Sequence, residues 1–227
     1  MEKYNQRKVG EKMSFLNNSF MEGLTKFADM VILSVLWLLF SIPVVTIVPA
    51  TIALYYASVK VVRRQAGYPF RDFINGFKQN VRQGMGLSVL YLLIGFLLYT
   101  SYDFSKAAVS GTMVSRFLVV CWMVSLLLVA CVSLYLIPVI SRFKLSLISA
   151  MRLAVAFSFG NLKTLIPLMF TLAGAVVLMY LWPPAVMAVP CAYCFLLSFS
   201  VEKVLISYMR SHLDHLEEHE TRWYMAD

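Results

Sequence analysis

The first long apolar run of the chain covers residues 30–59 and contains no charged side chain. A straight membrane-spanning helix needs only about 20 apolar residues, so this run is too long for one span. Two prolines, Pro43 and Pro49, interrupt it on either side of Thr46. The pattern therefore predicts either one kinked span or a hairpin of two spans joined by a turn within the membrane.

Further apolar runs cover residues 85–101, 117–140 and 164–201. The last run is 38 residues long and is interrupted by Trp182-Pro183-Pro184, which predicts two spans with a tight turn. The chain is therefore expected to be an all-α, polytopic membrane helix bundle. It has six membrane segments if residues 30–59 form a hairpin, and five if they form one span.

The distribution of Lys and Arg distinguishes these two topologies. With six spans, 18 basic residues lie on the side that holds both termini and only two, Lys106 and Arg116, lie opposite. With five spans, the split falls to 13 against 7. Because short cytoplasmic loops are enriched in Lys and Arg, the count favours six spans with both termini in the cytoplasm.

A turn within the membrane must satisfy its own backbone polar groups, because the hydrocarbon core supplies no water. Neighbouring helices, the hydroxyl groups of this stretch or a hydrated cavity can do so. The candidates for shaping the turn or such a cavity are Ser41, Pro43, Thr46, Pro49 and Tyr55.

Composition agrees with a membrane class, since 60% of the 227 residues are hydrophobic and 14% are charged, against roughly 25% charged in soluble domains. The whole chain, 1–227, is predicted to be one membrane domain with a cytoplasmic amphipathic arm (1–26) and a cytoplasmic tail (202–227). The polar start predicts no cleavable signal peptide. The formal charge of +8 comes from residues that flank the apolar runs, which argues against nucleic-acid binding.

Two basic linkers, 60–84 and 142–163, separate the apolar runs. The first predicts a turn at Gly67–Pro69 followed by an amphipathic helix. One interpretation is a helix at the membrane surface that binds anionic lipid headgroups. The other is a docking surface for a cytoplasmic partner, with apolar anchors and basic steering groups at Phe70, Phe73, Phe77, Arg71, Lys78 and Arg82.

The apolar runs contain no ionisable residue, which argues against a proton pump or an ion-coupled transporter. The chain has no Gly-rich phosphate loop and no acid–base pair within a run, so neither an ATPase nor another enzyme is predicted. We expect no catalytic residues and no cofactor.

Two clusters could still carry chemistry. Cys191 and Cys194 have redox or metal-pair spacing, but they lie in an apolar run without a nearby basic residue, which favours packing. His212, His215 and His219 share one helical face and could bind a metal, but a solvated cytoplasmic helix is the simpler explanation. We therefore expect no metal site.

The segments LWLLFSIPVVTIVPATIALYYASVKVVR (36–63) and YPFRDFINGFKQNVRQG (68–84) resemble the YesL-like family of bacterial integral membrane proteins, long catalogued as a domain of unknown function. AFSFGNLKTLIPL (156–168) is a looser match. The resemblance implies a multi-pass protein of the bacterial cytoplasmic membrane. It also implies a non-catalytic accessory role in ABC-type uptake of complex carbohydrates or oligosaccharides, with the lipid bilayer and importer permease subunits as partners.

Two other functions fit the residues. An uncharged interior with Ser, Thr and Tyr side chains would suit a passive pore or facilitator for a neutral solute. Aromatic residues around the first spans could stack on a sugar, although interfacial belts and lipid-facing rings explain such residues as well. They are Trp37, Phe40, Tyr55, Tyr56, Tyr91 and Tyr99.

The hairpin interpretation makes a direct topological prediction. Single cysteines placed at positions 5 and 66 of a cysteine-free variant should react with an impermeant thiol reagent from the same side of the membrane. Labelling from opposite sides would instead indicate one span between them.

Overall fold

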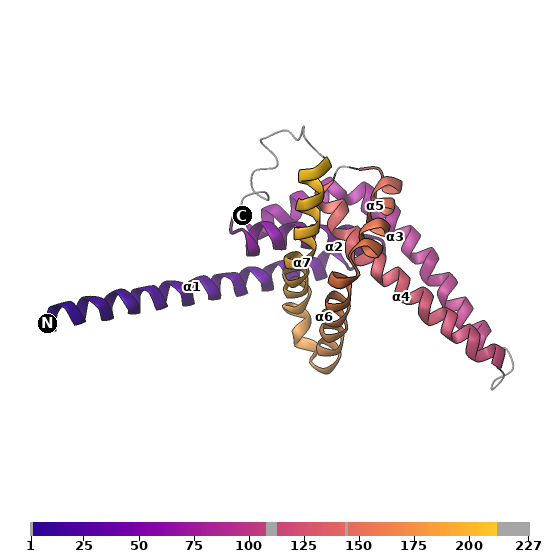
Figure 1. Ribbon diagram of the computed structural model, residues 1–227, viewed down its shortest axis with the longest axis horizontal. Coiled ribbons are helices and arrows are strands. Elements are labelled where there is room, and N and C mark those ends of the chain that lie inside the picture. The colour runs from indigo at the N-terminus through magenta and orange to yellow at the C-terminus, as the bar shows by residue number, and fades with distance from the viewer. Residues whose placement is uncertain (1, 108–112, 144, 213–227) are drawn as a thin grey trace.

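The computed structural model describes residues 2–107, 113–143 and 145–212, and these form helices without a strand (Figure 1). The predicted all-α class is confirmed. The elements, in chain order, are α1 (Glu2–Phe40), η1 (Val44–Thr46), α2 (Ile47–Ala57), η2 (Ser58–Arg63), α3 (Pro69–Ala107), α4 (Met113–Arg142), α5 (Leu147–Gly160), α6 (Leu162–Leu181), η3 (Pro183–Met187) and α7 (Val189–His212).

Six helical segments of the described chain are long and apolar enough to cross a membrane, which agrees with the six-span prediction. The shorter helix α5 connects the fourth and fifth of them. The segments are Met21–Phe40, Val44–Arg63, Pro69–Phe104, Met113–Arg142, Leu162–Leu181 and Val189–Tyr208.

The first apolar run is broken where the prolines predict it. Helix α1 ends at Phe40, a 3₁₀ turn (η1) follows Pro43, and α2 starts at Ile47. Pro49 lies in the first turn of α2, where the missing N–H costs no intrahelical hydrogen bond. The interruption between the two α-helices therefore ends at Thr46, and Pro49 already belongs to α2.

Thr46 closes this turn with its hydroxyl group. Its Oγ1 lies 2.6 Å from the carbonyl oxygen of Phe40 and 2.7 Å from that of Pro43, so its single hydrogen is shared between an acceptor that the end of α1 leaves open and one in the turn. The indole N–H of Trp37 donates to Thr51 Oγ1 at 3.1 Å and links α1 to α2. The hydroxyl of Ser41 is buried and has no hydrogen-bond partner among the described residues.

Helix α2 is the centre of the molecule. Ile52, Ala53 and Leu54 are at most 1% exposed, and the side chains around them come from α1, α3, α4 and α7. The ring of Phe40, at the end of α1, contacts the edges of Phe73 and Phe77 on α3 at 5.5 and 4.9 Å between centroids.

Two glycines allow α3 to approach α2 closely. A Cβ atom at Gly84 would lie 2.6 Å from Pro49 Cβ and 2.8 Å from its Cα, and one at Gly76 would lie 3.4 Å from Ala53 Cα. Such distances leave no room for a side chain at Gly84. The two helices are thus held together by backbone proximity as well as by apolar burial.

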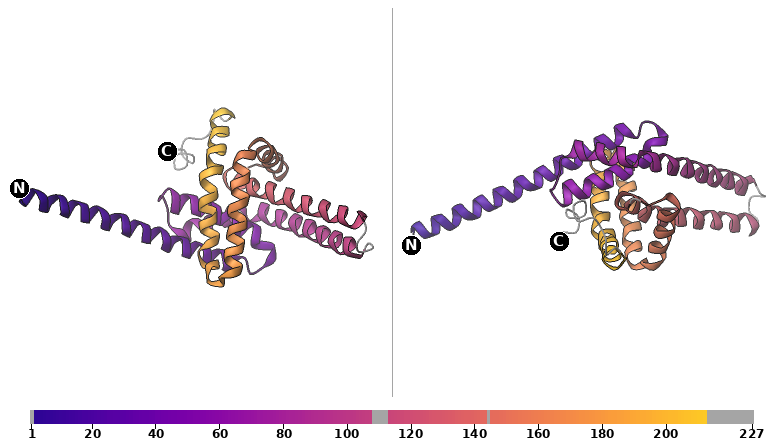
Figure 2. Two further views of the ribbon diagram at one scale, coloured as in Figure 1. Left: turned by 60° about the horizontal axis from the view of Figure 1, so that its bottom comes forward. Right: turned by 90° about the horizontal axis from the view of Figure 1, so that it is seen from above.

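The outer helices diverge from this centre. Helix α1 extends far from the rest of the molecule, and the paired ends of α3 and α4 project in a different direction from the α6–α7 pair (Figures 1 and 2). The predicted surface arm and the first span form one 39-residue helix, α1. Likewise, the predicted amphipathic helix after Pro69 continues into the next span as α3. The second basic linker does contain a separate helix, α5.

The close approach at Gly84 can be tested by adding a methyl group. Gly84→Ala should lower the free energy of unfolding in detergent by about 1–3 kcal/mol, because Pro49 belongs to a packed helix and cannot yield easily. Gly95→Ala on the same helix is the control, since its added Cβ meets no atom within 4 Å. Equal thermal unfolding curves for the two variants would contradict the argument.

Candidate functional site

A junction of partly and fully buried charges lies around η2, the π-helical turn that ends the second span. Its first anchor is Lys60, whose Nζ lies 2.6 Å from Asp72 Oδ1. Asp72 Oδ2 accepts a hydrogen bond from the backbone N–H of Tyr68 at 2.8 Å. This carboxylate, only 5% exposed, therefore caps the start of α3 and binds it to η2.

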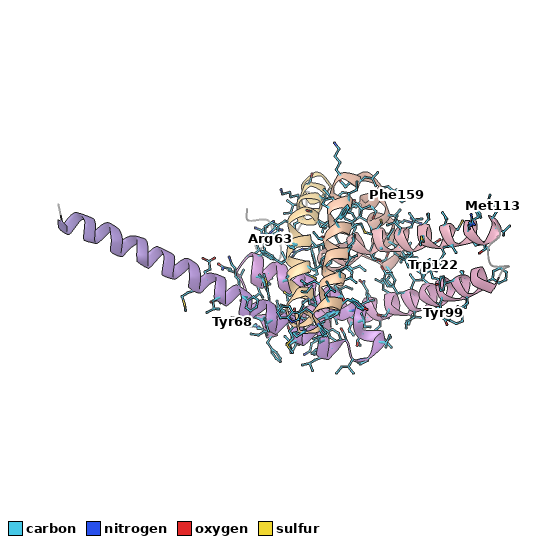
Figure 3. The ribbon with its side chains drawn as sticks, turned by 90° about the horizontal axis from the view of Figure 1, so that it is seen from below. Arg63, Tyr68, Tyr99, Met113, Trp122 and Phe159 are labelled. Atoms are coloured by element: carbon cyan, nitrogen blue, oxygen red, sulfur yellow. The ribbon has the colours of Figure 1, made fainter. Side chains whose placement is uncertain are left out.

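The second anchor is Arg63, labelled in Figure 3, which joins η2 to α7. Its Nη1 donates to the carbonyl oxygen of Ser198 at 2.8 Å. Its guanidinium carbon lies 5.0 Å from the centre of the Phe199 ring, in a cation–π arrangement. π-helical turns are frequent at functional positions, and here the turn connects two helices through two charges.

The third anchor is an ion pair inside the bundle. Arg142, at the end of α4, donates to Glu202 Oε1 on α7 from Nε at 2.9 Å and from Nη2 at 2.7 Å. Both side chains are 1% exposed. The hydroxyl of the fully buried Tyr55 on α2 donates to the same oxygen at 3.2 Å. Three helices thus converge on one carboxylate oxygen.

This ion pair corrects one conclusion from the sequence. Arg142 and Glu202 stand just beyond the apolar runs 117–140 and 164–201, but the helices that span Met113–Arg142 and Val189–Tyr208 include them. The candidate spans therefore do contain ionisable side chains. The sequence does place opposite charges at the same end of two spans. It contains no spacing pattern that would predict their pairing, because the two residues are 60 positions apart.

A burial of this kind is costly unless both charges are satisfied, since an unpaired ion inside a protein loses its hydration. Arg142 and Tyr55 satisfy Oε1 of Glu202, whereas Oε2 is buried and has no hydrogen-bond partner among the described residues. The arrangement acts as a clamp that fixes α2, α4 and α7 relative to one another.

An apolar cavity of about 270 Å³ lies beside this clamp, between α1, α2, α4, α6 and α7. Tyr55 contributes its ring to the cavity wall and its hydroxyl to the clamp. The wall also includes Trp37, Pro138, Val176 and Tyr193.

The five residues predicted to shape one turn or cavity lie at different positions in the structure. Ser41, Pro43 and Thr46 belong to the turn after α1, Pro49 packs against Gly84, and Tyr55 alone of this set lines the cavity. The structure thus does not bring the five residues into one site.

The predicted docking residues on α3 are also divided. Phe73 is fully buried and Phe77 is half-buried, and both pack on Phe40 of the same chain, so neither is available as an anchor for a partner. Phe70 is 61% exposed. The basic members, Arg71, Lys78 and Arg82, are exposed.

The two clusters with possible metal or redox chemistry lie apart from this junction. Cys191 and Cys194 are buried free thiols in α7. No group of three metal-ligating residues occurs within the described parts of the chain. The side chain of His212 and all of His215 and His219 lie outside what the structure describes.

Residues 30–102 match the family model described as "Protein of unknown function, DUF624". The resemblance to the YesL-like family is confirmed over this region. The match covers both segments on which the resemblance rests, and it contains the end of α1, the hairpin turn, α2, η2 and most of α3. No curated protein and no solved structure matches the chain.

The clamp can be tested with a double-mutant cycle. Arg142→Leu and Glu202→Leu should each lower the free energy of unfolding in detergent by about 3–5 kcal/mol, because each leaves one buried charge uncompensated. The double variant should be clearly more stable than the sum of the single losses predicts. Glu22→Gln is the control: it removes the charge of an exposed carboxylate that pairs with Lys26 and accepts a hydrogen bond from Gln65, and it should change stability much less than either clamp variant. Additive losses would contradict the clamp.

Proposed function

We propose that the protein is a non-catalytic accessory subunit that assembles with the permease of an ABC-type carbohydrate importer. It would act in the bacterial cytoplasmic membrane, with both termini in the cytoplasm. The carbohydrate part of the proposal rests on what the family resemblance implies. The assembly part rests on one feature of the structure, the exposed helical pair formed by α3 and α4.

This pair, the α3–α4 arm, consists of residues 92–104 and 113–128, and none of them is buried. Tyr99, Met113 and Trp122 mark the arm in Figure 3, where it projects from the remaining helices. Inside the arm, the indole N–H of Trp122 donates to the carbonyl oxygen of Leu98 at 2.9 Å. Because membrane helices are held together mainly by van der Waals packing, a helical pair without further neighbours offers a surface for additional helices.

A groove of about 510 Å³ on this arm has the chemistry of a helix–helix contact. Hydroxyl groups of Thr100, Ser101 and Ser125 and the thiol of Cys121 line it together with apolar side chains. The hydroxyls already donate to backbone carbonyls of their own helices, so they need no water. Small and hydroxyl-bearing residues are enriched where membrane helices meet. The groove therefore supports contact with a membrane helix of a partner.

The passive-pore alternative has less support in the arrangement of the described residues. Ser41 and Thr46 lie in the turn and do not line the cavity that includes Tyr55. The hydroxyl of Tyr55 is occupied by Glu202, and apolar atoms form the cavity wall. A neutral solute such as a sugar would find no free hydroxyls there from these three residues.

The arm groove gives a matched pair of variants for testing assembly. Ser125→Trp places a large ring into the groove and should abolish co-purification of permease subunits from native membranes. Val124→Trp adds the same ring to an exposed neighbouring position outside the groove and should preserve co-purification. Loss of the complex in both variants, or in neither, would contradict a partner seated on the groove.

The transport role requires a separate test in cells. Deletion of the gene should reduce growth on the oligosaccharide that the importer supplies, and the wild-type chain should restore it. Normal oligosaccharide uptake in the deletion strain would overturn the carbohydrate part of the proposal, whatever the co-purification shows.

A further inference from the structure

The cavity beside the clamp suggests a ligand that the proposed function does not include. We propose that it holds one acyl chain of a bilayer phospholipid, bound as an integral component between α4, α6 and α7. This inference does not depend on partnership with an importer. It follows from the hydrogen bonds that the polar groups of the cavity wall already make, and from the position of the cavity along the membrane-spanning helices.

The polar groups of the wall are nearly all engaged elsewhere. Trp37 donates to Thr51, whose hydroxyl donates to the carbonyl oxygen of Ile47. Ser133 pairs with the hydroxyl of Tyr91 at 2.7 Å, and Tyr55 donates to Glu202. A ligand in this space therefore meets hydrocarbon, which excludes sugars and other polyhydroxyl compounds as stable occupants. The aromatic residues Trp37 and Tyr55 act here as apolar wall.

An apolar cavity of this size does not hold water stably, because water there lacks hydrogen-bond partners. An engineered apolar cavity of roughly 150 Å³ stays dry and binds benzene. The present cavity, at about 270 Å³, has room for a longer hydrocarbon segment. An empty space would forfeit the dispersion contacts of the whole wall. A hydrocarbon occupant thus restores the dispersion contacts of the wall, which water cannot do because it would lack hydrogen-bond partners there.

The position of the cavity indicates where this hydrocarbon comes from. Its wall on α6 runs from Leu172 to Met179, and its wall on α7 runs from Pro190 to Leu197. Each wall covers about 10 Å along a membrane-spanning helix, beginning near the α6–α7 turn. Val176 lies in the wall and is also 59% exposed, so the cavity communicates with the outer surface of the span. In a bilayer that surface is covered by acyl chains.

Tyr193 is the exception among the polar wall residues. Its hydroxyl is buried without a hydrogen-bond partner among the described residues, and it lies about one helical turn from the start of α7. No polar atom of the described residues contributes to the cavity surface, so this hydroxyl is not presented to an occupant, which meets hydrocarbon at this residue as well.

The wall contains its own reporter for the experiment, since Trp37 is a cavity residue. A variant that keeps Trp37 and carries Phe at the other three tryptophans, 122, 182 and 223, is titrated in detergent with a phospholipid brominated on its acyl chains. Bromine quenches indole fluorescence on contact. The proposal expects quenching that saturates at a low ratio of lipid to protein and is absent with the unbrominated lipid.

Substitutions that fill the cavity should weaken the saturable quenching of Trp37 fluorescence by the brominated lipid. Ala175→Phe on α6 and Ala130→Phe on α4 each place a ring into the space, and each should weaken binding about tenfold, which corresponds to about 1.4 kcal/mol. Val177→Phe, on the exposed surface of α6 outside the cavity, should bind as before. Equal saturable quenching in the cavity-filling and control variants would overturn the proposal.

The unaltered chain supplies an independent readout that requires no cavity variant to fold. Native mass spectrometry of protein purified in mild detergent should show a retained phospholipid. A spectrum of the bare chain only, or quenching that rises linearly with lipid without saturation, would overturn the proposal. Neither result would bear on co-purification with a permease, so this inference and the proposed function fail separately.

Discussion

Enclosure of one short helix is the constraint on which the remaining structure depends. More than half of the apolar window in the segment Val44–Arg63 is buried, at 56%, against 6% in the segment Met113–Arg142. Helix α2 can be enclosed because Gly84 brings α3 against Pro49 and because Trp37 bonds to Thr51 from α1. The charges of η2 and the Arg142–Glu202 pair then fix α3, α4 and α7 around it.

The same enclosure separates the molecule into parts with different surroundings. The residues at the centre of the bundle, around α2, are enclosed by protein, and many of them are fully buried. No residue of the α3–α4 arm is buried, so its outer surface is available to lipid or to other helices. A bundle built in this way can keep a fixed centre while its periphery is adapted to an assembly.

The sequence predicts the helical class, the six spans and the break after Phe40, because these features depend on composition, length, proline and charge bias along the chain. It also identifies Thr46 as a hydroxyl that serves the turn, since such groups are what a turn within a membrane needs, whereas Ser41, predicted with it, has no hydrogen-bond partner among the described residues. The internal role of Phe73 and Phe77 could not be predicted, because their spacing is equally suitable for a partner and for Phe40. The clamp was missed for a related reason: pairing between distant helices leaves no periodic signal, and its charges stand at the ends of the apolar runs.

The clamp also has a consequence for the biosynthesis of the chain. Tyr55 and Arg142 emerge from the ribosome long before Glu202, which stands 147 positions after Tyr55 and belongs to the last span. Until α7 enters the membrane, the guanidinium of Arg142 lacks the carboxylate that neutralises it in the finished protein. Insertion of the last span, α7, therefore supplies the carboxylate that completes the clamp beside α2. A nascent chain that stops before α7 therefore lacks the carboxylate on which Tyr55 and Arg142 converge in the finished protein.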